Sequence, residues 1–189
     1  MIDAVYTLAE PYWQTRSGEI HMPESFAMAQ RLLEALPEAD ALIVLAGVLL
    51  HDVGYARVPE STHRAGLADA PGGWDADVTR RHEREGAVLA AEILRQVGMD
   101  SERLARVVEI VDGHDSRLEA LSLEDAIVKD ADKLWRYTES GVRVTHTWVD
   151  RTPEAFMDYV ESKIDAWLFT EAARSLAREA LAWSRGCAY

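Results

Sequence analysis

The sequence LAGVLLHDVGY, residues 45–55, joins the most apolar run of the chain directly to a His-Asp pair. Between residues 39 and 52, apolar side chains occupy nearly every face of a helix, which predicts a helix in the centre of a bundle. The Val-Gly pair that follows ends this helix. Burying an imidazole and a carboxylate at the end of this helix costs free energy unless they find strong hydrogen-bonding or ionic partners. We therefore expect other polar side chains to converge on His51 and Asp52.

Helical periodicity recurs on both sides of this run. One helix opens at residues 23–25 and is ended by Pro37. Four further patterns span residues 81–97, 101–113, 122–137 and 153–185, the last of them interrupted near 166–170. We predict an all-α fold, a single helical bundle over residues 1–189 with its motifs within 19–137, which helices at 152–185 complete.

Two segments lack a helical pattern. Residues 57–77 carry Pro59, Gly66 and a Pro-Gly-Gly sequence, and predict a long loop of the kind that lines or covers a site. In residues 142–147, β-branched and polar side chains alternate, so this segment is either extended or a loop. No other alternating pattern and no Asn-Gly hairpin occurs.

The net charge and the cysteine content limit which partners and which metal sites this protein can have. The net charge of −13 and the lack of a basic run predict no nucleic acid polymer as partner. A small anionic substrate is still compatible, because a metal ion inverts the local field. Cys187 is the only cysteine, which excludes an intramolecular disulfide and a multi-cysteine zinc site. Because the sequence has no signal-peptide pattern and no transmembrane run, we expect a cytoplasmic protein with no membrane partner. Nothing in the sequence indicates an oligomeric state.

Three more helices carry a polar residue on an otherwise apolar face. His82 shares a face with Leu89 and Ile93, His114 follows an apolar stripe on the preceding helix, and Asp132 lies between apolar positions of its own helix. A lone buried histidine is more often a hydrogen-bonded core residue than a ligand. Because a polar residue recurs on the apolar faces of several helices, metal ligation is the favoured explanation. Mixed imidazole and carboxylate donors suit iron, manganese, zinc, cobalt or nickel better than calcium.

These residues resemble the signature of the HD superfamily. That signature is a His, a His-Asp doublet and a distant Asp, here His21, His51, Asp52 and Asp132. The stretch LAGVLLHDVGY looks like the doublet helix of that family, and AIVKDADKL, residues 126–134, looks like its closing Asp motif. The resemblance implies an all-α, metal-dependent enzyme.

The two additional histidines match a subset of that superfamily. His82 and His114 stand between the doublet and the final Asp, as in members that bind two metals. The resemblance implies two divalent transition-metal ions, iron or manganese first, with Asp52 bridging them. His21, His51 and Asp132 would hold one ion, and His82 and His114 the other. Asp115 is expected only to cap a helix end.

Two reaction classes share this ligand set. The first is phosphohydrolases, in which a metal-bound hydroxide attacks a small phosphate ester or anhydride such as a nucleotide. The second is mixed-valent di-iron oxygenases, which cleave a small polyol or hydroxyphosphonate. The stretch HEREGAVLAAEIL, residues 82–94, looks more like the hydrolases, which we therefore favour. A binding module without turnover and a purely structural metal site are the remaining alternatives.

Other polar residues are candidates for substrate contact. Lys129 lies one helical turn before Asp132 and is predicted to neutralise a substrate phosphate as a catalytic and binding residue, with a solvated surface lysine as the alternative. His63 and Arg64, in the long loop, are predicted to bind substrate if that loop folds over the site, with simple exposure to solvent as the alternative. For Glu83 we expect a surface ion pair with a neighbouring arginine.

Overall fold

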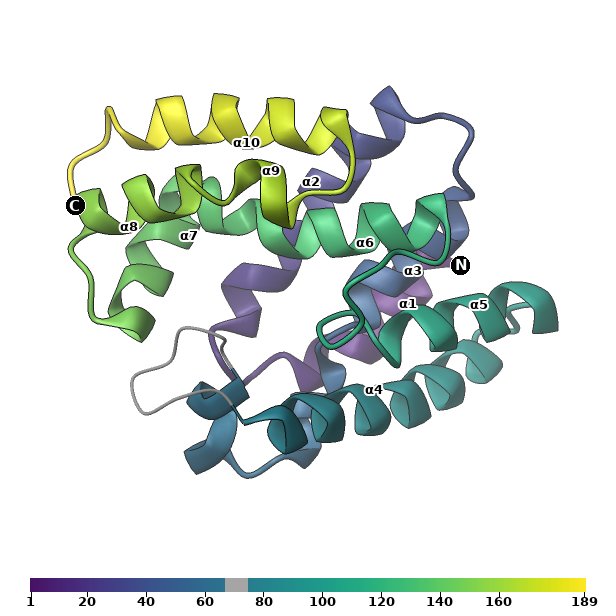
Figure 1. Cartoon of the computed structure of the whole chain (residues 1–189). Helices are drawn as coiled ribbons and strands as arrows, with labels where there is room; N and C mark the ends of the chain where they lie inside the picture. The colour runs from purple at the N-terminus through teal and green to yellow at the C-terminus, as the bar shows by residue number, and fades with distance from the viewer. Residues whose placement is uncertain (67–74) are drawn as a thin grey trace.

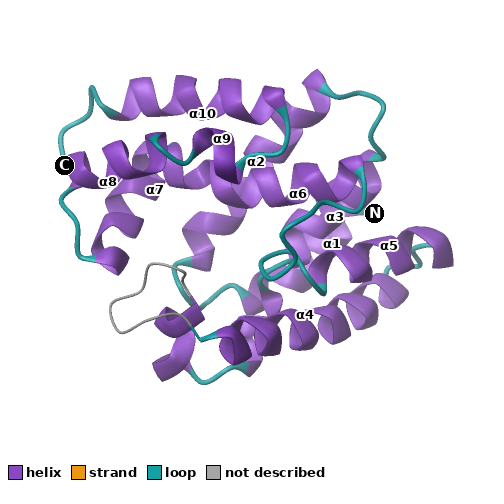
Figure 2. Cartoon of the chain, viewed as in Figure 1, coloured by secondary structure: helices purple, strands orange, loops and turns teal. Residues whose placement is uncertain are grey.

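Helices account for all the regular structure in the parts of the chain described by our computed structural model, residues 1–66 and 75–189 (Figure 2). Among these residues there is no strand, which confirms the all-α prediction. No helix within the two described ranges combines the length and the hydropathy of a transmembrane span.

The chain forms α-helices joined by short 3-10 segments. The α-helices are α1 (Ile2–Ala9), α2 (Gly18–Ala35), α3 (Ala41–Leu50), α4 (Ala76–Gln96), α5 (Ser101–Val111), α6 (Leu123–Leu134), α7 (Glu139–Thr145), α8 (Pro153–Glu161), α9 (Ile164–Trp167) and α10 (Glu171–Ser184). The 3-10 segments are η1 (Glu10–Tyr12), η2 (Val53–Arg57), η3 (Glu60–Gly66), η4 (Trp135–Tyr137) and η5 (His146–Val149).

Helix α3 is the centre of the bundle, as its all-round hydropathy predicts. It packs against α1, α2, α5 and α6, so it has no solvent face that would need polar residues. The Asp40 carboxylate caps it by accepting a hydrogen bond from the Leu42 amide at 3.0 Å. Gly47 lets α6 approach closely, because a Cβ there would lie 2.9 Å from Val128.

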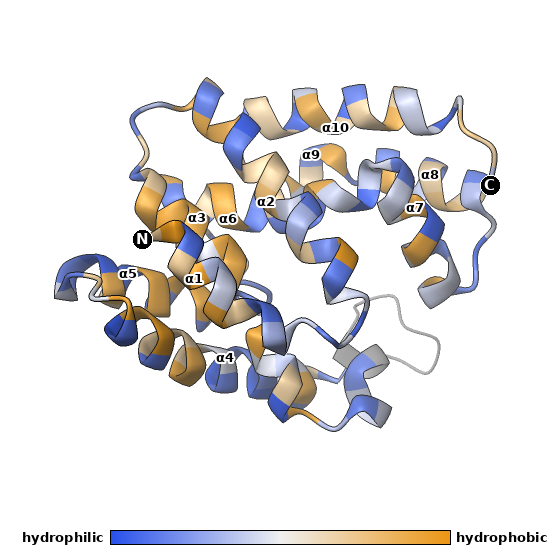
Figure 3. Cartoon of the chain, turned by 180° about the vertical axis from the view of Figure 1, so that it is seen from behind, coloured by the Kyte–Doolittle hydropathy of each residue, from blue (hydrophilic) through white to orange (hydrophobic). Residues whose placement is uncertain are grey.

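The other helices cover this centre on two sides. Helices α4 and α5 lie side by side along one edge, α8 and α10 lie along the opposite edge, and α2, α3 and α6 run between them (Figure 1). Hydrophilic and hydrophobic bands alternate along α4 and α5, as in helices that bury one face (Figure 3). Their buried faces carry Leu89, Ile93 and Val107.

The N-terminal part is more helical than the sequence pattern indicates. Helix α1 has no predicted counterpart, and α2 begins at Gly18 rather than at Pro23. Pro23 is therefore in the second turn of α2, where it supplies no amide donor to the helix. The consequence is functional, because His21 is carried on the helix and not on a preceding loop.

The prediction for residues 142–147 is wrong. Residues 142–145 belong to α7, which the Thr138 hydroxyl caps by accepting a hydrogen bond from the Gly141 amide, and residues 146–147 begin η5. Val142 is fully buried, so packing overrides the β-propensity of the segment.

The boundaries of the later segments differ less from the predictions. The predicted loop 57–77 contains η3, and α4 begins at Ala76, while residues 67–74 lie outside the described residues. The predicted interruption near 166–170 is confirmed, because α9 ends at Trp167 and α10 begins at Glu171.

Candidate metal centre

The His-Asp doublet lies where α3 ends. His51 is the C-cap residue, and its Nδ1 lies 2.7 Å from the Val48 carbonyl oxygen, to which it donates. With the proton on Nδ1, the neutral ring has a lone pair on Nε2. The ring is fully buried, so Nε2 is aimed into the protein as a fixed electron-pair donor.

Two glycines bring α4 against the doublet. A Cβ on Gly54 would overlap the carbonyl oxygen of His82 and the amide of Gly86, so only glycine allows η2 and α4 to pack this closely. Gly86 itself faces the His51 carbonyl. His82 is thereby placed beside Asp52, and its fully buried ring stacks on Tyr55 with centroids 4.0 Å apart.

The turn after α5 carries the fourth histidine. His114 Nδ1 lies 3.0 Å from the Val111 carbonyl oxygen, which repeats the arrangement of His51 and frees Nε2 in the same way. Glu83, fully buried, accepts hydrogen bonds from the amides of Asp115 at 2.9 Å and Ser116 at 2.7 Å. Glu83 also forms an ion pair with Arg80, as predicted. The pair is not a surface pair, because the Glu83 carboxylate is buried and only the Arg80 side chain is partly exposed.

Helices α2 and α6 complete the cluster. The Nδ1 of His21 lies 3.1 Å from the Ser25 hydroxyl one turn later. The Nε2 of His21 lies 3.4 Å from Asp132 Oδ1, and that of His51 lies 3.6 Å from the same oxygen. Arg136 pairs with this carboxylate at 3.6 Å.

The six predicted ligands thus converge, and among the described residues five of them, together with Asp115, form two groups of donor atoms that could each hold an ion; Asp132 is in neither group but lies beside His21 and His51. One contains His21, His51 and Asp52; the other contains Asp52, His82, His114 and Asp115. In the first group two imidazole Nε2 atoms lie 3.0 Å apart, and in the second 3.3 Å. Ligand nitrogens on one ion, each at about 2.1 Å, can lie no more than about 4.2 Å apart. The donor set is therefore compatible with divalent metal ions. Carbonyl oxygens hold the Nδ1 atoms of His51 and His114, and that of His21 lies beside a hydroxyl, as in metal sites generally, whereas the buried Nδ1 of His82 has no hydrogen-bond partner in the described part of the chain.

The electrostatics favour positive charge between these donors. Burial lowers the pKa of His114, but the Asp115 and Asp52 carboxylates outweigh burial and raise it to about 10. Burial raises the pKa of Asp52, but His51 and His114 outweigh burial and hold it well below its usual range. Burial and the nearby His51 lower the pKa of His21 to about 3. The Asp52 and Asp115 carboxylates thus stay charged in a buried cluster, and a bound divalent cation would supply the compensating charge in place of the proton on His114.

Asp115 is one residue that sequence reasoning missed. Its Oδ2 lies 3.6 Å from His82 Nε2 and 3.7 Å from His114 Nε2, so it belongs to the second donor group and does not merely cap a helix. The available signal was that His114 and Asp115 repeat the His-Asp pair of the doublet. Arg16, also missed, lines a small cavity together with His21 and Asp52.

The structure corrects the predicted role of Lys129. Its side chain is buried, and its ammonium donates to the carbonyl oxygens of Arg117 at 2.5 Å and Glu119 at 3.2 Å. Burial lowers its pKa to about 8. Because these carbonyls hold the ammonium, Lys129 fixes the segment between α5 and α6 and is not aimed at a substrate.

The loop residues predicted to bind substrate also need correction. His63 is buried, its Nε2 lies 2.8 Å from the Val58 carbonyl oxygen, and its ring meets the edge of Tyr55. His63 therefore packs against the Tyr55 ring and is not directed at the donor atoms. The side chain of Arg64 lies outside the described residues, so its predicted substrate contact stays a prediction.

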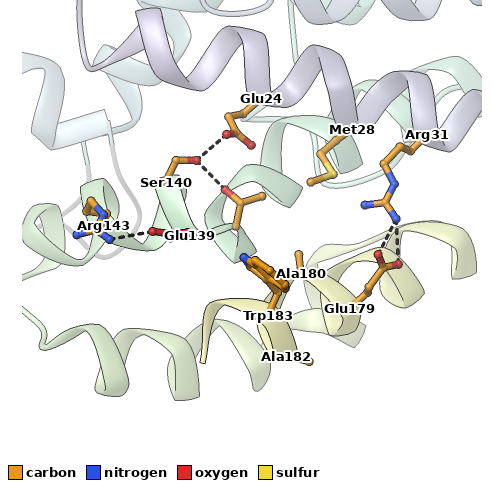
Figure 4. Close-up of a pocket in the computed structure, with 11 residues that line it drawn as sticks. Glu24, Met28, Arg31, Glu139, Ser140, Arg143, Glu179, Ala180, Ala182 and Trp183 are labelled. Atoms are coloured by element: carbon orange, nitrogen blue, oxygen red, sulfur yellow. Dashed lines mark hydrogen bonds and ion pairs between the residues drawn. The ribbon is translucent and has the colours of Figure 1, made fainter. Parts of the chain in front are cut away.

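An open groove of about 770 Å³ between α2, α7 and α10 is separate from these residues (Figure 4). Its charged groups pair with one another, Arg31 with Glu179 and Arg143 with Glu139. None of the six predicted ligands lines it. The cluster instead borders a small cavity of about 10 Å³, room for about one water, lined in part by Arg16, His21, Asp52 and Tyr55.

Replacing Glu83 by Gln should lower the free energy of unfolding by about 3 kcal/mol at pH 7, because the buried negative charge and the oxygen that accepts from Arg80 and the Ser116 hydroxyl are lost. Burial raises the pKa of Glu83, but His114 and the hydrogen bonds from Ser116 and Asp115 outweigh burial and lower it. A glutamate whose pKa is lower in the folded than in the unfolded state stabilises the folded protein at pH values above its unfolded-state pKa of about 4.3. This stabilisation is lost as the pH falls through the folded-state pKa.

The difference between wild type and Glu83→Gln should therefore be full at pH 7 and shrink below about pH 4.3. Urea unfolding followed by circular dichroism at several pH values measures it. Glu119→Gln, at an exposed site, is the control. A difference that is the same at every pH would contradict the charged role of Glu83.

Comparison with known proteins agrees with this geometry. The family model of the HD domain matches residues 18–136, which span α2 to η4 and contain all six converging residues. No curated protein and no solved structure gave a significant match. HD domains are generally metal-dependent hydrolases, and the His/Asp cluster is compatible with a metal site of that kind. The matched segment covers more than half of the chain, and the chain belongs to the HD domain family.

Proposed function

We propose that this protein is a metal-dependent phosphohydrolase that acts on a small phosphate ester or anhydride, such as a nucleotide, at a binuclear centre. The observation that carries the proposal is the orientation of Asp52. Its Oδ2 lies 3.7 Å from Nε2 of both His21 and His51, and its Oδ1 lies 3.3 Å from His114 Nε2 and 3.7 Å from His82 Nε2. A carboxylate with one oxygen toward each donor group is suited to bridge two ions.

The residues divide between two ions of the iron or manganese type. His21, His51, Asp132 and one oxygen of Asp52 would hold the first. His82, His114 and the other oxygen of Asp52 would hold the second, with Asp115 as a further donor. When bound, such ions lower the pKa of a water to make it a nucleophile and take up charge on the phosphoryl oxygens.

The protein's own side chains decide from which side a substrate reaches this centre. The four histidines are buried, whereas the Asp52 and Asp115 side chains are 19% and 30% exposed. The carboxylate side is therefore the open side. Carbonyl and hydroxyl contacts hold the other three imidazoles, Tyr55 stacks on His82, and Glu83 holds the His114 turn, so the donors need little reorganisation on binding.

Metal content and activity together test the proposal. The purified protein is assayed for bound metals and for phosphate release from a panel of nucleotides and small phosphate esters, with and without oxygen. We expect two ions per chain and release that does not depend on oxygen. Two irons without phosphate release, but with oxygen consumption on a polyol or hydroxyphosphonate, would replace the hydrolase by the di-iron oxygenase. Absence of bound metal would overturn both.

Replacing His82 by Ala should lower the metal content from two ions per chain to one, because the first donor group does not include His82. Elemental analysis after metal loading measures the content, and circular dichroism checks folding. His146→Ala is the control, since this ring is bonded to the Arg151 carbonyl oxygen outside the cluster. An unchanged metal content in His82→Ala would contradict the binuclear centre.

A further inference from the structure

A tight turn between η1 and α2 places Arg16 beside the metal centre. The indole of Trp13 donates to the Leu49 carbonyl oxygen at 3.2 Å, which ties the turn to the end of α3. The Gly18 amide donates to the Thr15 carbonyl oxygen at 2.8 Å. A Cβ on Gly18 would overlap the Trp13 carbonyl, so the turn closes only with glycine there. The position of Arg16 is thus determined by contacts with the helix that carries the doublet.

The backbone of this turn is strained. Arg16 and Ser17 have φ angles of 51° and 57°, in the left-handed region that non-glycine residues rarely adopt. Such a conformation costs free energy and persists only when surrounding contacts impose it. Strain of this kind is concentrated at ligand-binding and catalytic sites, so the conformation calls for a functional reason.

Aromatic rings hold the guanidinium of Arg16. Its Cζ lies 4.0 Å from the centroid of the Tyr55 ring and 5.6 Å from that of Trp148. Tyr55 in turn stacks on His82, with an interplanar angle of 13°. The flat face of the guanidinium contacts the Tyr55 ring, which orients the cation. The edge of the guanidinium, which carries its five N–H donors, stays free to bind a ligand.

No carboxylate neutralises this cation directly. Within residues 1–66 and 75–189, the Arg16 side chain has no hydrogen bond and no ion pair within 4.0 Å, in contrast to Arg80 and Arg136. Tyr55 and, from a longer distance, the carboxylates of Asp52, Asp115 and Asp132 outweigh the effect of burial, so the pKa of Arg16 is raised. A partly buried guanidinium beside the donor atoms, with its N–H groups unpaired, is suited to an anion from outside the chain.

We propose that Arg16 binds the non-bridging oxygens of the substrate's phosphoryl group while that group lies at the metal centre. The inference rests on the proposed function. A planar guanidinium matches two phosphate oxygens at once, which an ammonium cannot do. The surrounding carboxylates repel phosphate, and Arg16 adds positive charge on the side of Tyr55 and the small cavity. Arg16 therefore selects an anionic phosphoryl substrate over a neutral one of similar shape.

Binding of inorganic phosphate to the metal-loaded protein tests this role without turnover. Isothermal titration compares wild type with Arg16→Gln, Arg16→Lys and Arg151→Gln. Arg151 is the matched control, because its Cζ lies 4.1 Å from the Tyr159 ring centroid, away from the cluster. We expect Arg16→Gln to weaken phosphate binding about 10- to 100-fold, Arg16→Lys to weaken it less, and Arg151→Gln to leave it unchanged. Metal content per chain should be the same in all four proteins.

The outcomes separate this inference from the proposed function. Phosphate binding by Arg16→Gln as tight as that of wild type overturns the role of Arg16 and leaves the hydrolase standing. Wild-type protein that holds two ions but neither binds phosphate nor hydrolyses any ester overturns both. Loss of metal or helicity in Arg16→Gln and Arg16→Lys alike shows that Arg16 only supports the fold, and also overturns the inference.

Discussion

Replacing Asp52 by Asn should lower the rate of phosphate release at least about 10³-fold, the largest effect expected of any single substitution in this protein. Asn has nearly the same shape, but it cannot offer an anionic oxygen to each donor group. The two ions would lose their shared ligand, and the charge stabilisation that metals provide is worth several kcal/mol in the transition state, where 1.4 kcal/mol is about tenfold in rate.

The same variant should also bind less metal, which elemental analysis detects independently of activity. Asp165→Asn is the control, because this carboxylate is 81% exposed and pairs with Arg174 and Arg178 at the surface. Phosphate release and metal content equal to wild type in Asp52→Asn would show that Asp52 bridges nothing. Lost activity with full metal content would place Asp52 in substrate orientation instead.

Replacing Gly54 by Ala should lower the free energy of unfolding by about 3–5 kcal/mol, at the upper end for a single substitution. The added methyl group meets backbone on both sides, the His82 carbonyl and the Gly86 amide, and backbone cannot move aside as a flexible side chain can. To relieve the overlap, η2 must move away from α4, which would separate Asp52 from His82. We therefore expect weaker metal binding as well as lower stability.

Chemical denaturation and metal titration of Gly54→Ala measure the two effects. Gly186→Ala near the C-terminus is the matched control, because its Cβ would meet one carbonyl at 3.3 Å on an exposed turn. Stability and metal affinity close to those of wild type would mean that η2 and α4 do not need this close approach. Lower stability with unchanged metal affinity would mean that the donors are placed by other contacts.

Local patterns in the sequence predict the helices well because helical periodicity depends on near neighbours. The all-apolar run before His51 predicted the central helix, and the apolar faces that include His82 and Asp132 predicted where polar groups enter the core. The pattern fails where distant contacts override it. Residues 142–147 look extended, but Val142 is buried and the segment is helical.

The sequence by itself determined that this protein is an α-helical bundle of the HD family and which six side chains share its centre. The helices follow from residue type and spacing, since a buried helix face is a local property of the chain, whereas the family and the place of His21 among the six follow from the resemblance to the HD signature. Only the tertiary structure decided which other charged residues face that centre. Asp115 and Arg16 lie beside it, and Lys129, one turn from Asp132, lies away from it.

The physical reason is that long side chains at turns and helix ends are directed by contacts from distant segments. Glu83 on α4 holds the amides of the turn after α5 and so places Asp115. The Trp13 contact with α3 and the Gly18 packing impose the strained turn at Arg16. Carbonyls between α5 and α6 draw the ammonium of Lys129 away from the donors. These contacts join segments that no local pattern relates, so they exist only once the bundle has formed.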